Sequence, residues 1–507
     1  MPIDAVGSAV PSPELDRLRG AHVLVMGAGI SGRAVIAPLH DLGARVTVTD
    51  SNTDALGRCV DLGAGIVPFD ELAAEPGRMA DFALVITSPG FRPDTPVLRV
   101  AADAGIPVWG DIEFTWRVDR AEVYGPPRPW LVVTGTNGKT TTTSMLHSIL
   151  EAAGVSSAAC GNIGLPVLDA LRAQGPRVDV LAVELSSFQL YWAPSVCPDA
   201  GVVLNIAEDH LDWHGGMQGY VDAKAQALTG AIAVVGLDDE AAARLASRPR
   251  DGHTVGFRLG APDVGQLGVR GGMLIDRAFA DSVPLVAADE ISPPGPAGIS
   301  DALAAAALAR AIGVSPAAVG AGLRAYRVGP HRAELVGRVG EVSYVDDSKA
   351  TNPHAARSSI VAHESVVWIA GGQLKGARVD DLVVEVADRL AGAVLLGRDA
   401  DQIAQALARH APDVPVVQLR SGDHGPVGEQ IAGAEVLHLD LAAADAETVM
   451  AEAVRAAAAL AAPGDTVLLA PAAASLDMFD SYGHRGRSFA AAVAALMDTE
   501  PGPGTPG

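Results

Sequence analysis

Residues Gly135–Thr140, with the sequence GTNGKT, have the composition of a phosphate-binding loop. They follow the apolar run WLVVT and precede a helical run that begins TTTSMLHS. A glycine-rich turn between a strand and a helix directs backbone N–H groups and the helix dipole at phosphate oxygens. Lys139 would then neutralise the β- and γ-phosphates, and the Thr140 hydroxyl would ligate Mg²⁺. The spacing GxxGKT is two residues shorter than the usual GxxxxGKT, and an ordinary strand-to-helix turn is the alternative.

More polar groups follow the next apolar runs. Glu184 ends the run VLAVE, and the segment Asn205–His214 (NIAEDHLDWH) follows another run. Carboxylates at the carboxyl edge of a parallel sheet lie where ligands bind in such folds. Oxygen atoms and imidazoles together predict a metal-rich edge. The alternatives are a helix cap or solvated acid for Glu184 and a structural role for the histidines.

A second glycine-rich segment, Gly27–Gly32 (GAGISG), follows the apolar run HVLVM, and Asp50 ends the next run. This spacing satisfies the dinucleotide-binding pattern GxGxxG and, taken alone, suggests an NAD-dependent oxidoreductase. The pattern guarantees only a tight turn at a helix N-terminus, which would hold any diphosphate. Ser88–Gly90 (SPG) follows a third run on the same expected edge. A second nucleotide without redox chemistry fits equally well.

The last third of the chain carries four polar segments: His331–Arg332, Asp346–Asn352 (DDSKATN), Gly371–Lys375 (GGQLK) and Ala470–Phe479 (APAAASLDMF). Each one singly is more typical of a turn or a cap. Three of them follow apolar runs of one region, as a crevice along a parallel-sheet edge would require.

The elements that must position these residues alternate between short apolar runs and Ala-rich helical stretches, which predicts an α/β fold with mostly parallel sheets. We expect a linker at residues 120–129, a domain junction at 326–333 and a disordered tail at 498–507. Region 250–296 is rich in Gly and Pro and gives no assignment. The predicted strands are 22–26, 45–49, 83–87, 130–134, 179–184, 200–204, 231–235, 342–345, 366–370, 393–396, 435–439 and 466–470.

Composition narrows the class of protein. The 507 residues predict about three domains. The net charge of −23 disfavours nucleic-acid binding, because no basic excess is available to displace counterions. The three cysteines are scattered, which excludes a disulfide framework and fits a reducing compartment. We find no apolar run long enough to span a membrane and no secretory signal, so we expect a cytoplasmic protein that does not associate with membranes.

The motifs taken together resemble the Mur ligase family over about residues 20–490. They occur in family order: GAGISG, SPG, GDIEF, TGTNGKTTT, GNIGLP, ELSSFQL, NIAEDHLDWH, YVDAKAQAL, GPHR, DDSKATN, GGQLK and ASLDMFDSY. The Asp-Asn-Pro-Arg string of the diaminopimelate-adding branch is absent from the sequence. The resemblance is therefore greatest to the branch that adds D-glutamate.

This resemblance implies three domains: an N-terminal Rossmann-like domain at 1–121 with an extension at 1–19, a central P-loop ATPase-type domain at 122–328, and a C-terminal Rossmann-like domain at 329–497. It implies an ATP- and Mg²⁺-dependent ligase that adds D-glutamate to UDP-N-acetylmuramoyl-L-alanine through an acyl phosphate, for peptidoglycan precursor synthesis. Domain closure should accompany turnover, and we expect a monomer.

The site residues implied by the resemblance fall into four groups. Catalysis and two Mg²⁺ sites would use Lys139, Thr140, Glu184, His210 and Lys224, the lysine at 224 being carbamylated and thereby an anionic ligand. ATP would contact Gly135, Thr136, Asn137, Gly138, Lys139, Thr140, Thr141, Arg332, Asp347 and Lys349. The UDP-linked substrate would contact Ile30, Ser31, Asp50, Ser51, Ser88, Gly90, Asn162, Ser186, Gln189 and His210. D-glutamate would contact Thr351, Lys375, Ser475, Leu476 and Tyr482.

The sequence departs from the family pattern at a few positions. Tyr482 stands where Phe is frequent, and Asn52 stands where some members have Arg in the uridine pocket. Gly298 and Asp301 fall where Asn is expected near the adenine. The alternatives to the D-glutamate ligase are another Mur-type or folylpolyglutamate-type ligase, an NAD-dependent oxidoreductase, and a non-catalytic nucleotide-binding protein. The GTNGKT loop argues against the oxidoreductase.

Overall fold

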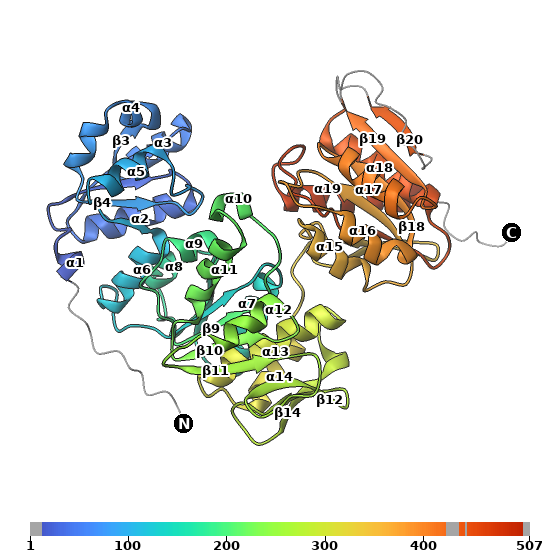
Figure 1. Cartoon of the computed structure of the whole chain (residues 1–507), viewed down its shortest axis with the longest axis horizontal. Helices are drawn as coiled ribbons and strands as arrows, with labels where there is room; N and C mark the ends of the chain where they lie inside the picture. The colour runs from blue at the N-terminus through green and yellow to red at the C-terminus, as the bar shows by residue number, and fades with distance from the viewer. Residues whose placement is uncertain (1–12, 422–435, 442–443, 500–507) are drawn as a thin grey trace. The chain divides into compact units, whose positions relative to one another are not determined.

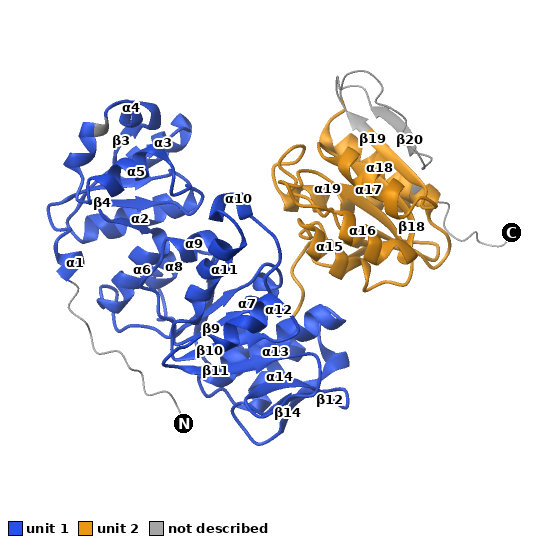
Figure 2. Cartoon of the chain, in the orientation of Figure 1, with its two compact units in different colours: residues 1–326 blue, residues 327–507 orange. Residues whose placement is uncertain are grey.

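The computed structural model describes residues 13–421, 436–441 and 444–499. The chain divides into two compact units, residues 1–326 and 327–507, which Figure 2 colours separately. The first unit contains a five-stranded and a nine-stranded sheet, and the second contains a seven-stranded sheet. Helices pack against all three sheets (Figure 1). The predicted α/β class is confirmed.

The first sheet is parallel throughout, with the strand order β3-β2-β1-β4-β5. This order is that of a dinucleotide-binding fold without its sixth strand, and in such folds ligands meet the carboxyl ends of the strands. Its strands are β1 (His22–Met26), β2 (Arg45–Asp50), β3 (Gly65–Pro68), β4 (Leu84–Thr87) and β5 (Val108–Gly110). Its helices are α1 (Pro13–Asp16), α2 (Ile30–Asp41), α3 (Thr53–Val60), α4 (Phe69–Ala74), α5 (Pro96–Asp103) and α6 (Asp111–Arg120).

The second sheet has the order β14-β13-β12-β11-β10-β9-β6-β8-β7 and is parallel from β7 to β12. Its strands are β6 (Trp130–Thr134), β7 (Ser157–Gly161), β8 (Val180–Glu184), β9 (Ala200–Val203), β10 (Ile232–Gly236), β11 (His253–Phe257), β12 (Gln266–Arg270), β13 (Met273–Asp276) and β14 (Val283–Ala287). Its helices are α7 (Lys139–Ala152), α8 (Val167–Arg172), α9 (Ser187–Tyr191), α10 (Leu211–His214), α11 (Met217–Ala225), α12 (Glu240–Ala243), α13 (Pro296–Ala311) and α14 (Pro316–Ala325).

Region 250–296, which the sequence left unassigned, contributes β11 to β14. The strands β12, β13 and β14 pair antiparallel. Gly271 and Gly272 join β12 to β13, and both have a positive φ, 58° and 75°. A two-residue loop with two positive φ angles is the turn that matches the twist of a hairpin. The antiparallel edge therefore rests on a Gly-Gly pair.

The third sheet, in the second unit, has the order β15-β16-β21-β17-β18-β19-β20, with only β15 antiparallel among the described strands. Its strands are β15 (Glu334–Val339), β16 (Val342–Asp346), β17 (Val366–Gly371), β18 (Leu390–Leu396), β19 (Val416–Ser421), β20 (Val436–Leu441) and β21 (Thr466–Leu469). Its helices are α15 (Pro353–Ile360), α16 (Asp380–Val386), α17 (Ala400–His410), α18 (Ala446–Leu460) and α19 (Tyr482–Thr499).

The segment 120–129, expected to be a linker, connects α6 to β6 and is packed on the protein rather than exposed. Arg128 is buried, and its guanidinium donates to Asp119 at 3.1 Å. The indole N–H of Trp130 donates to the same carboxylate at 3.0 Å. A buried Arg–Asp pair with further hydrogen bonds keeps this connection packed on the sheet. The predicted tail lies almost entirely outside the described residues, as does most of the N-terminal extension.

Within the described part of the chain, no helix is both long and apolar enough to cross a membrane.

Candidate functional site

The order of the strands brings the central motifs together. Strands β9, β6 and β8 are neighbours in the sheet. Asn205 lies in the loop after β9, Gly135–Thr140 form the loop after β6, and Glu184 is the last residue of β8. Strand β7, next to β8, is followed by Asn162. The carboxyl ends of parallel strands share one edge, so these segments lie at one edge of the sheet.

The loop Gly135–Thr140 has no room for a side chain at its fourth residue. Gly138 has a φ of 82°, and an added Cβ would lie 2.2 Å from Oδ1 of Asp301 on α13. The same Oδ1 accepts a hydrogen bond from the Thr142 hydroxyl at 3.1 Å. Asp301 therefore buttresses the start of α7. The positive φ requires glycine here, because other residues adopt it only with strain.

Asn205 anchors the loop from the neighbouring strand. Its Oδ1 accepts from the Asn137 N–H at 2.9 Å, and its backbone oxygen accepts from the Thr136 N–H at 3.0 Å. The Thr136 hydroxyl lies 3.0 Å from the phenol oxygen of Tyr220 on α11. The sequence placed Asn205 in a metal-rich segment, whereas the structure uses it to fix the backbone of the loop.

Two lysines converge on the carbonyls of this loop. The Nζ of Lys139 donates to the oxygens of Gly135 and Thr136, both at 2.9 Å, and the Nζ of Lys224 donates to Gly135 at 2.8 Å. Lys224 is only 1% exposed. Burial, followed by the charge of Lys139, lowers the pKa of Lys224 well below its ordinary value. Such a lysine is neutral in a larger fraction of molecules than an exposed one.

Glu184 offers an oxygen to a ligand. Its side chain is 1% exposed, and its Oε1 accepts from the Asn162 amide at 2.7 Å. Its Oε2 is buried and has no hydrogen-bond partner among the residues that the structure describes. A buried carboxylate oxygen without a partner is costly, and a divalent cation would satisfy it. Glu184 and the adjacent loop therefore fit the expected Mg²⁺ site.

The two imidazoles of the segment Asn205–His214 play different parts. His210 has a φ of 52° and its Nε2 lies 3.4 Å from Asp209. His214 packs among aromatic rings, and its Nε2 lies 2.9 Å from the Ser187 hydroxyl. Burial lowers the pKa of His214 to about 4. His214 is thus a neutral structural histidine, and His210 is the imidazole on the half-exposed side of the loop.

The loop Gly27–Gly32 has the tight geometry that its sequence predicts. A Cβ at Gly32 would lie 1.8 Å from the backbone oxygen of Gly27. Asp50 accepts from the Ala28 N–H at 2.7 Å and from the Asn52 N–H at 2.8 Å. The side chain of Asn52 caps α3. A helix-capping role thus occupies the position where some family members have Arg.

The other predicted residues of this region follow the neighbouring strands or face across to the second sheet. Ser88 lies directly after β4, and Trp213 donates its indole N–H to the oxygen of Gly90 at 3.3 Å. Ser186 and Gln189 form a capping box at the start of α9. Ile30, within the loop, and Ser51, directly after β2, are both exposed. The junction of the two sheets therefore runs along the residues predicted for the UDP-linked substrate.

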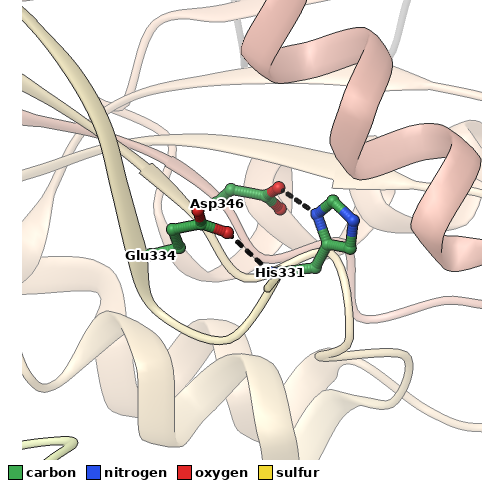
Figure 3. Close-up of side chains that lie close together, drawn as sticks. All are labelled: His331, Glu334 and Asp346. Atoms are coloured by element: carbon green, nitrogen blue, oxygen red, sulfur yellow. Dashed lines mark hydrogen bonds and ion pairs between the residues drawn. The ribbon is translucent and has the colours of Figure 1, made fainter. Parts of the chain in front are cut away.

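In the second unit, the strands β16, β21 and β17 are neighbours, so the segments after them share one edge as predicted. Figure 3 shows His331, Glu334 and Asp346 at this edge. The Nδ1 of His331 lies 2.6 Å from Asp346, and its backbone N–H donates to Glu334 at 2.9 Å. Possible ligand atoms of the three lie within 4.8 Å of one another. These contacts fix the imidazole, and Asp346 sets which ring nitrogen faces away.

Arg485, which the sequence did not single out, ties the predicted D-glutamate segments together. Its buried guanidinium donates to the backbone oxygens of Ser348 at 2.9 Å and Ala473 at 3.1 Å, and to Gly371 at 3.4 Å. Ser348 and Ala473 follow β16 and β21, and Gly371 is the last residue of β17. Burial lowers the pKa of Arg485 to about 10. Its Nε also donates to the Ser348 hydroxyl at 3.0 Å. The sequence around Arg485 gave no recognisable signal for this role, because its acceptors lie far away in the sequence and three of them are backbone oxygens.

The remaining predicted residues of the second unit lie around this edge. Lys349 places its Nζ 4.0 Å from the centre of the Tyr482 ring, a cation–π contact. Lys375 is exposed and has a φ of 53°, while Ser475 is buried and Leu476 exposed. The pKa of Asp347 is raised to about 6 by burial. Arg332 and Thr351 are half-buried.

The sequence of each of the three sheet regions matches a known family of protein domains. Residues 21–110 match the Mur ligase MurD-like N-terminal domain, 133–308 match the Mur ligase middle domain, and 331–473 match the Mur ligase glutamate ligase domain. The chain therefore belongs to the Mur ligase family, whose members are carbon–nitrogen ligases.

Particular relatives are similar over nearly the whole length. The chain is 69% identical to the UDP-N-acetylmuramoylalanine--D-glutamate ligase of Rhodococcus jostii (strain RHA1), covering 95% of this chain and 97% of that protein. It is 62% identical to the ligase of the same name from Nocardia farcinica (strain IFM 10152), covering 96% and 99%.

The fold is also that of a solved UDP-N-acetylmuramate-alanine ligase from Thermotoga maritima, with a TM-score of 0.55, 18% identity, and coverage of 95% and 100%.

Proposed function

We propose that this protein joins D-glutamate to UDP-N-acetylmuramoyl-L-alanine, with conversion of ATP to ADP and phosphate, in the synthesis of peptidoglycan precursors in the cytoplasm. The observation that carries the proposal is the shared edge at which three features meet: the phosphate loop, the two lysines, and the Glu184 oxygen that has no hydrogen-bond partner among the described residues. The choice of D-glutamate is supported by the identity to ligases of that name.

The first half of the reaction forms an acyl phosphate. An oxygen of the substrate carboxylate bonds to the γ-phosphorus of ATP as the bond to the ADP oxygen breaks. Such a transfer between anions needs positioning and charge neutralisation more than covalent help. Lys139, on the loop itself, supplies a positive charge, and the N–H groups at the start of α7 face the phosphates.

In the second half, the amino group of D-glutamate attacks the acyl carbon, loses a proton, and the tetrahedral intermediate expels phosphate. The proposed acceptor pocket consists of the residues around the edge of the third sheet. Lys375 would pair with a carboxylate of D-glutamate. Arg485 would hold the backbone of the pocket through Ser348 and Ala473.

Mg²⁺ would be held by Thr140 and Glu184 at one site and by His210 and modified Lys224 at a second, and when bound it would neutralise phosphate charge. An ammonium cannot ligate a cation, so we propose that Lys224 is carbamylated. The neutral amine bonds to the carbon of CO₂ and releases a proton. Burial of Lys224 favours that neutral amine.

The test is release of ADP with UDP-N-acetylmuramoyl-L-alanine and Mg²⁺, comparing D-glutamate, L-glutamate and meso-diaminopimelate as acceptors. We expect turnover with D-glutamate only. Turnover with another acceptor would move the protein to a different branch of the family. No turnover with any acceptor would overturn the proposed substrate while leaving the phosphate loop as a nucleotide site.

A further inference from the structure

The segment that enters the third sheet carries two residues in an unusual backbone conformation. His331 has a φ of 62° and Ala333 has a φ of 47°. Residues other than glycine adopt such angles rarely and at a cost, so the surrounding contacts must hold them there. Arg332, which the proposed function places on a phosphate of ATP, lies between the two. The direction in which its side chain leaves the backbone therefore depends on its two neighbours.

The imidazole of His331 holds the first of these residues in place. Its Nδ1 lies 2.6 Å from Oδ2 of Asp346, the last residue of β16, which is fully buried. Glu334, the first residue of β15, pairs with Asp346 across the two strands and accepts the His331 N–H at 2.9 Å (Figure 3). Oδ1 of Asp346 accepts the Ser348 N–H at 2.9 Å. The side chain and the backbone of His331 are thus both tied to the ends of two paired strands.

Helix α19 packs directly on this His331–Asp346 pair. A Cβ added at Gly486 of the helix would lie 2.2 Å from Nδ1 of His331 and 2.6 Å from Oδ2 of Asp346. Only 12% of the His331 side chain is exposed. A hydrogen bond shielded from water is electrostatically stronger than one at the surface. The pair is therefore a firm support for the segment beside it.

The same segment is joined to the two other residues of this unit that are predicted to contact ATP. The backbone oxygen of His331 accepts from the Lys349 N–H at 3.2 Å, and the Ala333 N–H donates to Oδ1 of Asp347 at 3.3 Å. One of these hydrogen bonds precedes Arg332 in the chain and the other follows it. The backbone at Arg332 is thus fixed relative to both of the other predicted ATP contacts.

We propose that His331 and Asp346 are positioning residues that set the backbone at Arg332 before ATP binds. Arg332 would then meet the nucleotide at a fixed place relative to Asp347 and Lys349. The inference rests on the proposed function, which supplies the ATP contacts of these three residues. Contacts arranged in advance lower the entropy lost on binding, so the affinity for ATP should depend on the pair. Binding of the UDP-linked substrate should not, because its predicted contacts all lie in the first unit.

The test uses the full chain with His331→Gly, which allows the positive φ but removes the hydrogen bond to Asp346. We expect the KM for ATP to rise about tenfold, the effect of one hydrogen bond to a charged group, and the KM for UDP-N-acetylmuramoyl-L-alanine to change less than about twofold. Calorimetry with ATP alone checks that the change in KM is a change in affinity. His331→Asn places an amide N–H where Nδ1 lies and also tolerates a positive φ, so it should recover most of the loss.

A double-mutant cycle tests whether the pair acts through Arg332. In an Arg332→Ala background, His331→Gly should raise the KM for ATP further by less than about twofold, because the group that it positions is already gone. A merely structural role would instead add the whole of the tenfold effect in that background, and this result would overturn the inference.

His410→Gly is the matched control, because it removes another imidazole that lies beside a carboxylate in the same unit. Nε2 of His410, the last residue of α17, lies 3.1 Å from Oδ1 of Asp380. We expect this variant to leave the KM for ATP unchanged.

Gly486→Ala is the second variant if His331→Gly does not fold. It keeps both members of the pair but forces a Cβ against their hydrogen bond, so it should show the same selective rise in the KM for ATP. Equal rises in the KM values for ATP and the UDP-linked substrate, or no rise in either, would overturn the inference. Failure of the unaltered chain to bind ATP would instead overturn the proposed function.

Discussion

The two glycine-rich loops of the first unit each join a strand to a helix, and they have opposite electrostatic surroundings. Gly27–Gly32 has carboxylates beside it: Asp50 binds its Ala28 N–H, and Asp111 faces Ser31. Gly135–Thr140 has the ammonium groups of Lys139 and Lys224 on its carbonyls. In the proposed function, the glycine spacing sets the path of the backbone, and the charges around each loop determine whether it holds a nucleotide or assists phosphoryl transfer.

The largest effect should come from removing the ammonium group of Lys139 from the second loop. We expect Lys139→Ala to lower kcat by about 10²–10³-fold, as loss of one electrostatic stabiliser does. Release of phosphate with all three substrates measures it. Arg33, which donates to the Ala28 oxygen of the first loop, provides the comparison. Arg33→Ala should leave kcat near that of the unaltered chain, and near-normal activity in Lys139→Ala would refute the phosphate assignment.

The buried lysine of α11 that donates to the second loop should show chemical rescue. Lys224→Ala removes the proposed anionic ligand, so we expect activity to be lost and partly restored by formate or acetate at high concentration. The measurement is initial rate against carboxylate concentration, with chloride at the same ionic strength as the control. Full activity without any additive would rule out the carbamate.

In the first loop, an added methyl group should destabilise the fold at Gly32 and be tolerated at Gly29. Gly32→Ala places a Cβ against the Gly27 carbonyl, and we expect a loss of about 1–3 kcal/mol in the free energy of unfolding. Gly29→Ala meets nothing within 4 Å and has a φ of −72°, so its effect should stay within about 0.5 kcal/mol. Urea unfolding of both variants, with UDP binding as a second readout, measures the difference. Equal effects would show that this loop is not tightly packed.

The smallest expected effect is a dependence of the free energy of unfolding on pH that arises from the carboxyl group of Asp111. The pKa of Asp111 is about 6 in the folded chain and about 3.9 in the unfolded chain. The folded state therefore holds a proton that the unfolded state has released, and stability falls as pH rises through that window. Between pH 5 and 6 we expect this group to contribute a loss of about 1 kcal/mol. Subtracting the urea-unfolding profile of Asp111→Asn from that of the unaltered chain isolates it, and coincident slopes would contradict it.

Much of the fold could be predicted because parallel strands buried on both faces are continuous apolar runs, as WLVVT is in β6. The structure of two segments could not be predicted from the sequence. The hairpin at Gly271–Gly272 carried a recognisable turn signal inside a region whose Gly and Pro content obscured it. The segment 120–129 has the composition of a linker, and only the tertiary contact of Arg128 with Asp119 shows that it is packed.

The residues of the candidate site also fall into those that could be placed from sequence and those that could not. Motifs that follow adjacent strands, such as Gly135–Thr140 and Glu184, could be placed at one edge from sequence because strand ends share it. Residues that support them from a distance could not. Arg485 binds backbone oxygens, and Asp301 meets Gly138 from another helix. Neither contact depends on a local pattern, so only the fold reveals it.

The tryptophan side chains at the junction of the first two sheets make the intrinsic fluorescence of the protein sensitive to what binds there. Trp213 donates to Gly90 and Trp192 to the oxygen of Phe91, so both chromophores border the loop expected to meet uridine. Five of the six tryptophans belong to the first unit, and Trp368 is buried in the second. Binding of a ligand at the loop that contains Gly90 and Phe91 should therefore change the tryptophan fluorescence of the protein. A Trp213→Phe substitution would show how much of that change comes from Trp213.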